Sequence, residues 1–272
     1  MSVVDAALHR VIAGEAERFV AYLRSLSEDA WTQPSGLGDW TICEAAAHVT
    51  ATCENGVMFI DRALAGITDP APGRQTLQGD ALSASLAARA KTFVAKYPDV
   101  VGSLHANATR LADMLAGLSA QDFQLPVWRP TGVTSVRRIA QGRVAELALH
   151  HWDLRRALGD TSSLNAEVVE VLLDWLSYWL NDCFRAAAPL DTPTTFTFAL
   201  RDAENQHIIV YGDRYILEPS EPPDVTIRCD AGDYILLATG RLVLADTASE
   251  RRLEVEGPLD LASTFQTWFK AI

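Results

Sequence analysis

The stretch Val144-Ala145-Glu146-Leu147-Ala148-Leu149-His150-His151-Trp152-Asp153-Leu154 is apolar enough to lie in a protein core, yet it carries a carboxylate and an imidazole four residues apart. On a helix, this spacing places Glu146 and His150 on one face, one turn from each other. Burying a carboxylate is costly unless it is paired or bound to a metal. Our hypothesis is therefore that Glu146 and His150 share a cation.

The surrounding sequence predicts that this stretch belongs to one helix, from about Ser135 to Leu158. At about 100° per residue, one stripe of this helix is formed by Ala140, Val144, Leu147, His151, Leu154 and Leu158. A polar stripe lies directly beside it, formed by Arg143, Glu146, His150 and Asp153. Such a pair of stripes is expected at the rim or in the interior of a helical bundle. His151 points about 100° away from His150, so we expect a structural role for it.

Four further helices are predicted before this one by apolar residues at helical spacing, over residues 4–26, 41–65, 81–96 and 99–117. The second begins with Thr41 and Glu44, which have the spacing of a capping box. Residues 66–80 are rich in Gly, Pro and Asp and predict a loop. Residues 118–133 predict an irregular connection that could contain a short hairpin.

The pattern changes in the second part of the chain. A long helix over residues 165–185 is followed by predicted strands at 194–200, 207–211, 224–228 and 253–256. Helical segments are predicted between and after them, at 231–239 and 258–270. A helical block followed by a strand-rich block predicts an α+β protein of two domains. We place the helical domain at residues 1–165 and the α+β domain, led by a linking helix, at residues 166–272.

The amino-acid composition excludes some classes of binding partner. The net charge is −12 and the basic residues are scattered, which argues against nucleic acid and anionic membranes as partners. No stretch approaches the roughly 20 apolar residues of a membrane span, and the first residues do not resemble a signal peptide. The cysteines lie far apart, at Cys43, Cys53, Cys183 and Cys229. They predict reduced thiols in a cytoplasmic protein. Separately, we expect the partners to be a small electrophilic substrate and a low-molecular-weight thiol, and the protein to be a monomer or small homo-oligomer.

Catalytic zinc usually takes three protein ligands and leaves one position open. His48, on the helix predicted at 41–65, is a candidate third ligand because its neighbours Ala45, Ala46 and Ala47 are small and permit close approach. By spacing alone, four other histidines are equal candidates: His9, His105, His151 and His207.

The alternative to a metal site is an ordinary charged helix. Glu146 could be solvated or paired with Arg143 or Arg155, and each histidine could be an ordinary core residue. Asp153 could orient a ligand histidine, although a surface ion pair with Arg156 or Arg143 is the stronger expectation. We find neither a G-x-S-x-G nucleophile motif nor a phosphate-binding loop.

Several motifs in order resemble the mycothiol-dependent maleylpyruvate isomerase family of DinB-like metalloproteins. In the first domain they are Asp39-Trp40-Thr41, Ala47-His48-Val49, and Glu146-x-x-x-His150 followed by Trp152-Asp153-Leu154. In the second they are Gly232-Asp233-Tyr234-x-x-x-Leu237-x-x-Gly240-Arg241 and Leu253-Glu254-Val255-Glu256-Gly257. The resemblance implies a DinB-like four-helix bundle followed by a C-terminal α+β domain similar to sterol carrier proteins.

The resemblance also implies that His48, Glu146 and His150 are the zinc ligands. It implies a catalytic arginine in the C-terminal domain, for which the candidates are Arg228, Arg241, Arg251 and Arg252. Arg241 is our choice, while for Arg228 and Arg241 a solvated side chain is the simpler expectation.

The implied cofactors are Zn²⁺, or another divalent metal, and mycothiol as cosubstrate. A thiolate could add to an activated double bond of a small electrophile, permit rotation and leave, which is isomerisation; it could instead stay attached, which is S-transfer. Two other functions are compatible with the sequence: a metal-dependent hydrolase that uses zinc-bound water, and a ligand-binding protein without catalysis on the same scaffold.

Overall fold

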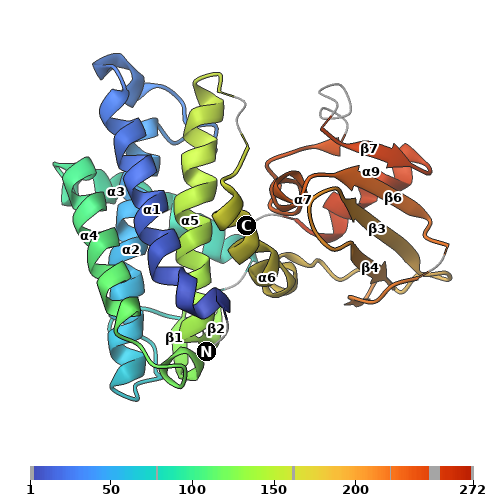
Figure 1. Cartoon of the computed structure of the whole chain (residues 1–272), viewed down its shortest axis with the longest axis horizontal. Coiled ribbons are helices and arrows are strands. Elements are labelled where there is room, and N and C mark those ends of the chain that lie inside the picture. The colour runs from blue at the N-terminus through green and yellow to red at the C-terminus, as the bar shows by residue number, and fades with distance from the viewer. Residues whose placement is uncertain (1–2, 78, 161–162, 221, 245–251, 271–272) are drawn as a thin grey trace. The chain divides into compact units, whose positions relative to one another are not determined.

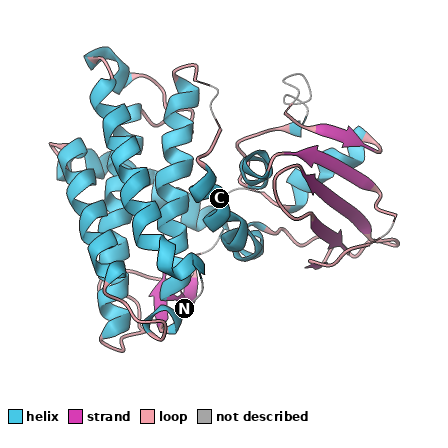
Figure 2. Ribbon diagram, viewed as in Figure 1, coloured by secondary structure: helices cyan, strands magenta, loops and turns pink. Residues whose placement is uncertain are grey.

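The computed structural model describes residues 3–77, 79–160, 163–220, 222–244 and 252–270. The chain forms two compact units, Met1–Leu172 and Leu173–Ala271. The first is helical and the second mixes helices with a sheet, which confirms the expected two-domain α+β class (Figure 2). The expected division of the chain at residue 165 stays a prediction.

Four long helices make the core of the first unit: α1 (Val3–Ser25), α2 (Ile42–Leu64), α4 (Val100–Ala116) and α5 (Val136–Ala157). They pack in a ring, because α1 contacts α4 and α5, and α2 contacts the same two helices (Figure 1). A fifth helix, α3 (Gly79–Lys96), packs on α2. The apolar side chains at the centre of this unit are fully buried, as the helical spacing of apolar residues in the sequence predicts.

Side-chain caps fix the starts of α2, α4 and α5. The predicted capping box is confirmed: the Thr41 hydroxyl accepts a hydrogen bond from the Glu44 N–H, and the Glu44 carboxylate accepts one from the Thr41 N–H. Asp99 caps α4, and Ser135 caps α5 through the N–H of Arg138. These caps satisfy N–H groups that have no partner within the first helical turn.

Two of the segments between these helices contain short elements of regular structure. A 3₁₀ helix (η1, Glu28–Thr32) follows α1, and another (η2, Asp122–Gln124) follows α4. The hairpin expected within residues 118–133 is confirmed, with β1 (Pro126–Arg129) antiparallel to β2 (Gly132–Ser135). It leads directly into α5.

The second unit contains a five-stranded sheet of order β5-β4-β3-β6-β7. The strands are β3 (Thr194–Leu200), β4 (Gln206–Val210), β5 (Tyr215–Ile216), β6 (Val225–Cys229) and β7 (Glu254–Glu256). Pairing is antiparallel except between β3 and β6, which are parallel. The helices are α6 (Ala166–Cys183), within which the boundary of the two units falls, α7 (Ala231–Ala238) and α9 (Leu259–Trp268).

Buried and partly exposed side chains alternate along β3, and the buried ones form part of the core of this unit. Phe196 and Phe198 lie on one face of the strand and both contact Phe265 of α9, with ring centroids 5.7 and 5.0 Å apart. The Tyr234 ring of α7 packs on Phe198 at 4.4 Å. The four cysteines of the chain are free thiols. Within the described residues, no helix is both long and apolar enough to cross a bilayer.

Candidate metal site

The packing of α2 on α5 brings three predicted ligands together. His48 comes from α2, and Glu146 and His150 come from consecutive turns of α5. Glu146 Oε2 lies 3.2 Å from His48 Nε2 and 3.2 Å from His150 Nε2. One donor atom from each residue lies within 4.8 Å of the others, which suits a single metal ion. Among the described residues, no other group of His, Cys, Asp and Glu has this geometry.

The electrostatics of the cluster are those of an anion held between two imidazoles. Burial favours a raised pKa for the Glu146 carboxyl, but hydrogen bonds from His150 and His48 outweigh it and hold the pKa well below the usual value. Burial opposes charge on His150 as well, yet its carboxylate partners Asp153 and Glu146 raise its pKa to about 9. Burial lowers the pKa of His48. A carboxylate with two converging imidazole nitrogens is a ligand set that divalent transition metals prefer.

Asp153 supports His150 from behind. Its Oδ2 lies 3.0 Å from His150 Nδ1, and its side chain is only 7% exposed. Our expectation of a surface position for Asp153 is therefore wrong, because one helical turn places it under the His150 ring. The bond at Nδ1 orients the ring so that Nε2 faces Glu146, where a metal would take the place of the Nε2 proton; carboxylate partners of ligand histidines have this role.

Arg143 contacts Glu146 from the preceding turn of α5. Its Nη2 lies 3.9 Å from Glu146 Oε1, and its Nη1 donates a hydrogen bond of 2.9 Å to the carbonyl of Thr52 on α2. Gly56 makes room for this side chain, since a Cβ there would lie 3.1 Å from Arg143 Cγ and Cδ. The sequence offered Arg143 as a partner of Glu146 but gave no sign of Thr52 or Gly56. The other suggested partner of Glu146, Arg155, instead bonds Asp160.

Aromatic packing holds the His48 ring. Ring centroids of Trp40 and Phe93 lie 5.0 and 6.5 Å from it, and the His150 ring meets it edge-on at 5.2 Å. Its Nδ1 is buried and has no hydrogen-bond partner among the described residues. The orientation of the His48 ring therefore depends on this aromatic packing and on the contact of its Nε2 with Glu146 Oε2.

The remaining candidate histidines lie elsewhere. His151 is buried against Glu15 of α1, as its expected structural role allows. His207 bonds Thr197 within the sheet of the second unit. His9 and His105 belong to α1 and α4 and are not part of the cluster.

Two of the candidate arginines are engaged in ion pairs inside the second unit. Arg228 makes two hydrogen bonds to Glu256, of 2.9 and 3.2 Å, at the exposed edge of the sheet. Arg252 is largely buried and bonds Asp233 of α7. These ion pairs explain the positions of both guanidinium groups, and no bound substrate is needed to explain them.

Arg241 follows α7, and its Nη1 donates a hydrogen bond of 3.2 Å to the carbonyl of Thr239. It is partly buried. Arg251 lies outside the described residues. Arg241 therefore stays our candidate for the catalytic arginine as a prediction.

Comparison with known proteins gives two family matches that together span most of the chain. Residues 12–155 match the family described as the mycothiol maleylpyruvate isomerase N-terminal domain, and residues 170–264 match its C-terminal domain. Among curated protein sequences, none matches this chain.

Among solved structures, the crystal structure of a mycothiol-dependent maleylpyruvate isomerase superposes with a TM-score of 0.58 at 14% identity, over 95% of this chain and 98% of that one. A mutant of such an isomerase gives a TM-score of 0.56 at 14% identity, over 89% and 93% of the two chains. At this identity the likeness establishes a shared fold.

A sterol carrier protein 2-like protein of Aedes aegypti covers 36% of this chain and 94% of its own at 19% identity, but the TM-score of 0.28 is too low to carry an argument. The expected similarity of the second domain to sterol carrier proteins stays a prediction. The family match over residues 12–155, extended by the match over 170–264, settles the relationship. The chain belongs to the mycothiol maleylpyruvate isomerase family.

Proposed function

We propose that the chain is a thiol-dependent metalloenzyme that isomerises a small electrophile, with His48, Glu146 and His150 as the ligands of a Zn²⁺ ion. The observation that carries the proposal is the convergence of three donor atoms within 4.8 Å on two packed helices. Two histidines and a glutamate form a three-ligand set that leaves a further zinc position open. The buried Asp153 behind His150 is the support that such a ligand set requires.

The same cluster is accessible to a cosubstrate. The Glu146 side chain is 28% exposed, whereas His48 and His150 are 6% and 13% exposed. A bound zinc ion with an open position would hold a thiol as its thiolate at neutral pH. The name shared by the family and its solved relatives supports mycothiol as that thiol and cis–trans isomerisation as the reaction.

Within this proposal the chain's residues have separate tasks. Glu146 and the two imidazoles would bind the cation, Asp153 orients the His150 ring with its Nε2 toward the cluster, and Arg143 places a positive charge beside the carboxylate of Glu146. Arg241 is proposed as the arginine that contacts the substrate, by resemblance to the family. S-transfer would use the same ligands, and the electrophile that accepts the thiol decides between the two reactions.

Metal content tests the ligand set. Purified wild-type protein should contain about one zinc ion per chain, and His150→Ala should lose it. His105→Ala, which removes an exposed imidazole from α4, is the matched control and should keep the metal. A wild-type protein that cannot be loaded with zinc or another divalent metal would end the metalloenzyme proposal.

Thiol binding tests the chemistry. Cobalt-substituted protein should change its visible spectrum when mycothiol is added, because a thiolate ligand alters the metal's coordination. An unchanged spectrum together with water-dependent hydrolysis of a substrate would favour a hydrolase. An unchanged spectrum without turnover would favour a ligand-binding protein.

A further inference from the structure

A second buried cluster lies between α1 and α5, and the proposed metal chemistry does not use it. Glu15 of α1 and His151 of α5 are 5% and 8% exposed, and Glu15 Oε1 lies 2.7 Å from His151 Nδ1. Arg18 donates a hydrogen bond of 2.9 Å to the other oxygen, Glu15 Oε2. The Phe19 ring stacks on the imidazole at 5.0 Å. These contacts fix the imidazole and consume both oxygens of Glu15.

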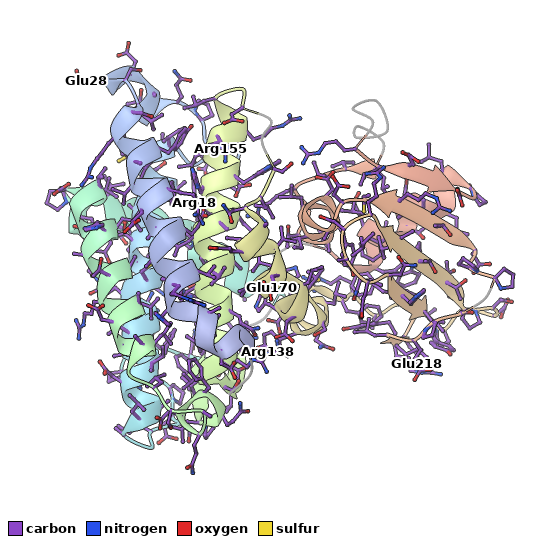
Figure 3. All side chains as sticks on the ribbon, in the orientation of Figure 1. Arg18, Glu28, Arg138, Arg155, Glu170 and Glu218 are labelled. Atoms are coloured by element: carbon purple, nitrogen blue, oxygen red, sulfur yellow. The ribbon has the colours of Figure 1, made fainter. Side chains whose placement is uncertain are left out.

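The cluster borders a cavity of about 130 Å³ in the first unit. A single water molecule needs only about 10–15 Å³ of such a cavity, so the cavity has room for an ion the size of phosphate. Its polar lining includes the carboxylate of Glu15 as well as Arg18, His151, Arg155, Ser163 and Asn165. Figure 3 labels Arg18 on α1 and Arg155 on α5, which contribute its two cations.

The lining carries hydrogen-bonding groups that the protein itself leaves unused. Arg155 donates its Nε–H to Asp160 at 2.9 Å, and no described residue accepts from its two Nη atoms. His151 bonds Glu15 through Nδ1, and its Nε2 has no partner among the described residues. Asn165 accepts from the N–H of Glu167 through Oδ1, which leaves its amide nitrogen as a donor.

A structural role for the cluster explains only part of this arrangement. A tether between α1 and α5 requires the bond between Glu15 and His151, and nothing more. It does not require a cavity beyond the imidazole, nor two guanidinium groups on its wall. The Arg155 side chain is 22% exposed and Asn165 lies at the surface, so their unused donors are open to a ligand or to water that enters the cavity.

We infer that this cavity is a binding site for a small free oxyanion that carries a hydroxyl group, of the class of hydrogen phosphate. The guanidinium fork of Arg155 matches two oxygens of such an anion. Arg18 adds a second guanidinium, whose charge Glu15 balances, and Ser163 and Asn165 supply neutral donors. The Nε2 of His151 accepts from the hydroxyl group, because Glu15 holds the proton at Nδ1. This inference is independent of the proposed metal chemistry.

Calorimetric titration with inorganic phosphate tests the site. Wild-type protein should bind one phosphate per chain, and Arg155→Gln should bind it about tenfold or more weakly, since a charged hydrogen-bond donor is lost. Arg110→Gln removes the same charge from an exposed side chain on α4 and should bind as the wild type does. His150→Ala, which removes a proposed metal ligand, should also bind phosphate unchanged, so that failure of this site and failure of the metal proposal are distinguishable.

A magnetic resonance titration of wild-type protein tests the same site without a variant, in case Arg155→Gln folds poorly. In wild-type protein with labelled histidines, the imidazole signal of His151 should move on addition of phosphate, while that of the exposed His105 should not. Failure of the wild type to bind phosphate at millimolar concentration would overturn the inference. So would a folded Arg155→Gln variant that binds with wild-type affinity, or a bound protein in which the His151 signal stays still.

Discussion

Arg143 is not a proposed ligand, but it lies beside one and should support the proposed metal site. It donates a hydrogen bond to the carbonyl of Thr52 on α2, and its charge lies 3.9 Å from the carboxylate of Glu146 on α5. We predict that Arg143→Ala weakens zinc binding about tenfold or more, in the range typical of residues behind metal ligands. Competition with a chromogenic chelator measures this affinity. Arg110→Ala, an exposed arginine of α4, is the control and should bind zinc normally; unchanged affinity in a folded Arg143→Ala would contradict the role.

Asp153 acts through charge rather than size. Asp153→Asn keeps the shape and one acceptor for His150 Nδ1 but removes the negative charge that makes the imidazole a stronger ligand. We predict that zinc binds about 10- to 100-fold more weakly to this variant. The chelator competition that serves for Arg143 measures it, and the exposed Asp113→Asn on α4 should leave affinity unchanged. If Asp153→Asn binds zinc as tightly as the wild type, the carboxylate serves only packing.

At the residue scale, the sequence alone could predict only what one helix determines. Spacing identified Glu146 and His150, because residues four apart share a face. It could not identify His48, which lies 98 residues before Glu146 on another helix; the family resemblance singled it out. Gly56 and Thr52 were not predictable, since their part in holding Arg143 exists only once α2 packs on α5.

At the scale of elements, the cap of α2 should matter for stability. Thr41 and Glu44 satisfy each other's backbone N–H groups at the start of the helix that carries His48. We predict that Thr41→Ala lowers the free energy of unfolding by about 1 kcal/mol, measured by urea denaturation. Thr32→Ala is the matched control, because the Thr32 hydroxyl bonds only a carbonyl at the exposed end of η1. Equal stability of the two variants would show that the capping box contributes nothing measurable.

The long elements were predictable and the short ones were not. Each long helix lies within about two residues of its predicted range, because many apolar positions at one period define it. The 3₁₀ helix at Glu28–Thr32 and the strand at Tyr215–Ile216 were missed, since so few residues show no period. The parallel pairing of β3 with β6 beside antiparallel β4 was not predictable either, because pairing depends on the path of the chain between strands.

At the scale of the whole molecule, the two units should respond differently to metal. Each has its own buried core, around residues such as Phe19 and Leu104 in the first and Phe196 and Phe265 in the second. Domains with separate cores can unfold separately. All three proposed ligands belong to the first unit, so a bound metal stabilises only the folded form of that unit.

We therefore predict two thermal transitions in calorimetry, of which only one depends on zinc. Free zinc at one hundred times its dissociation constant stabilises a folded unit by about 2.7 kcal/mol, which corresponds to a rise in Tm on the order of 5–10 °C for a unit of this size. Chelation should lower that transition and leave the other in place. His150→Ala should show both transitions, neither of them sensitive to zinc. A single transition that moves as a whole with zinc would mean that the two units unfold together, because stabilising one would then stabilise both.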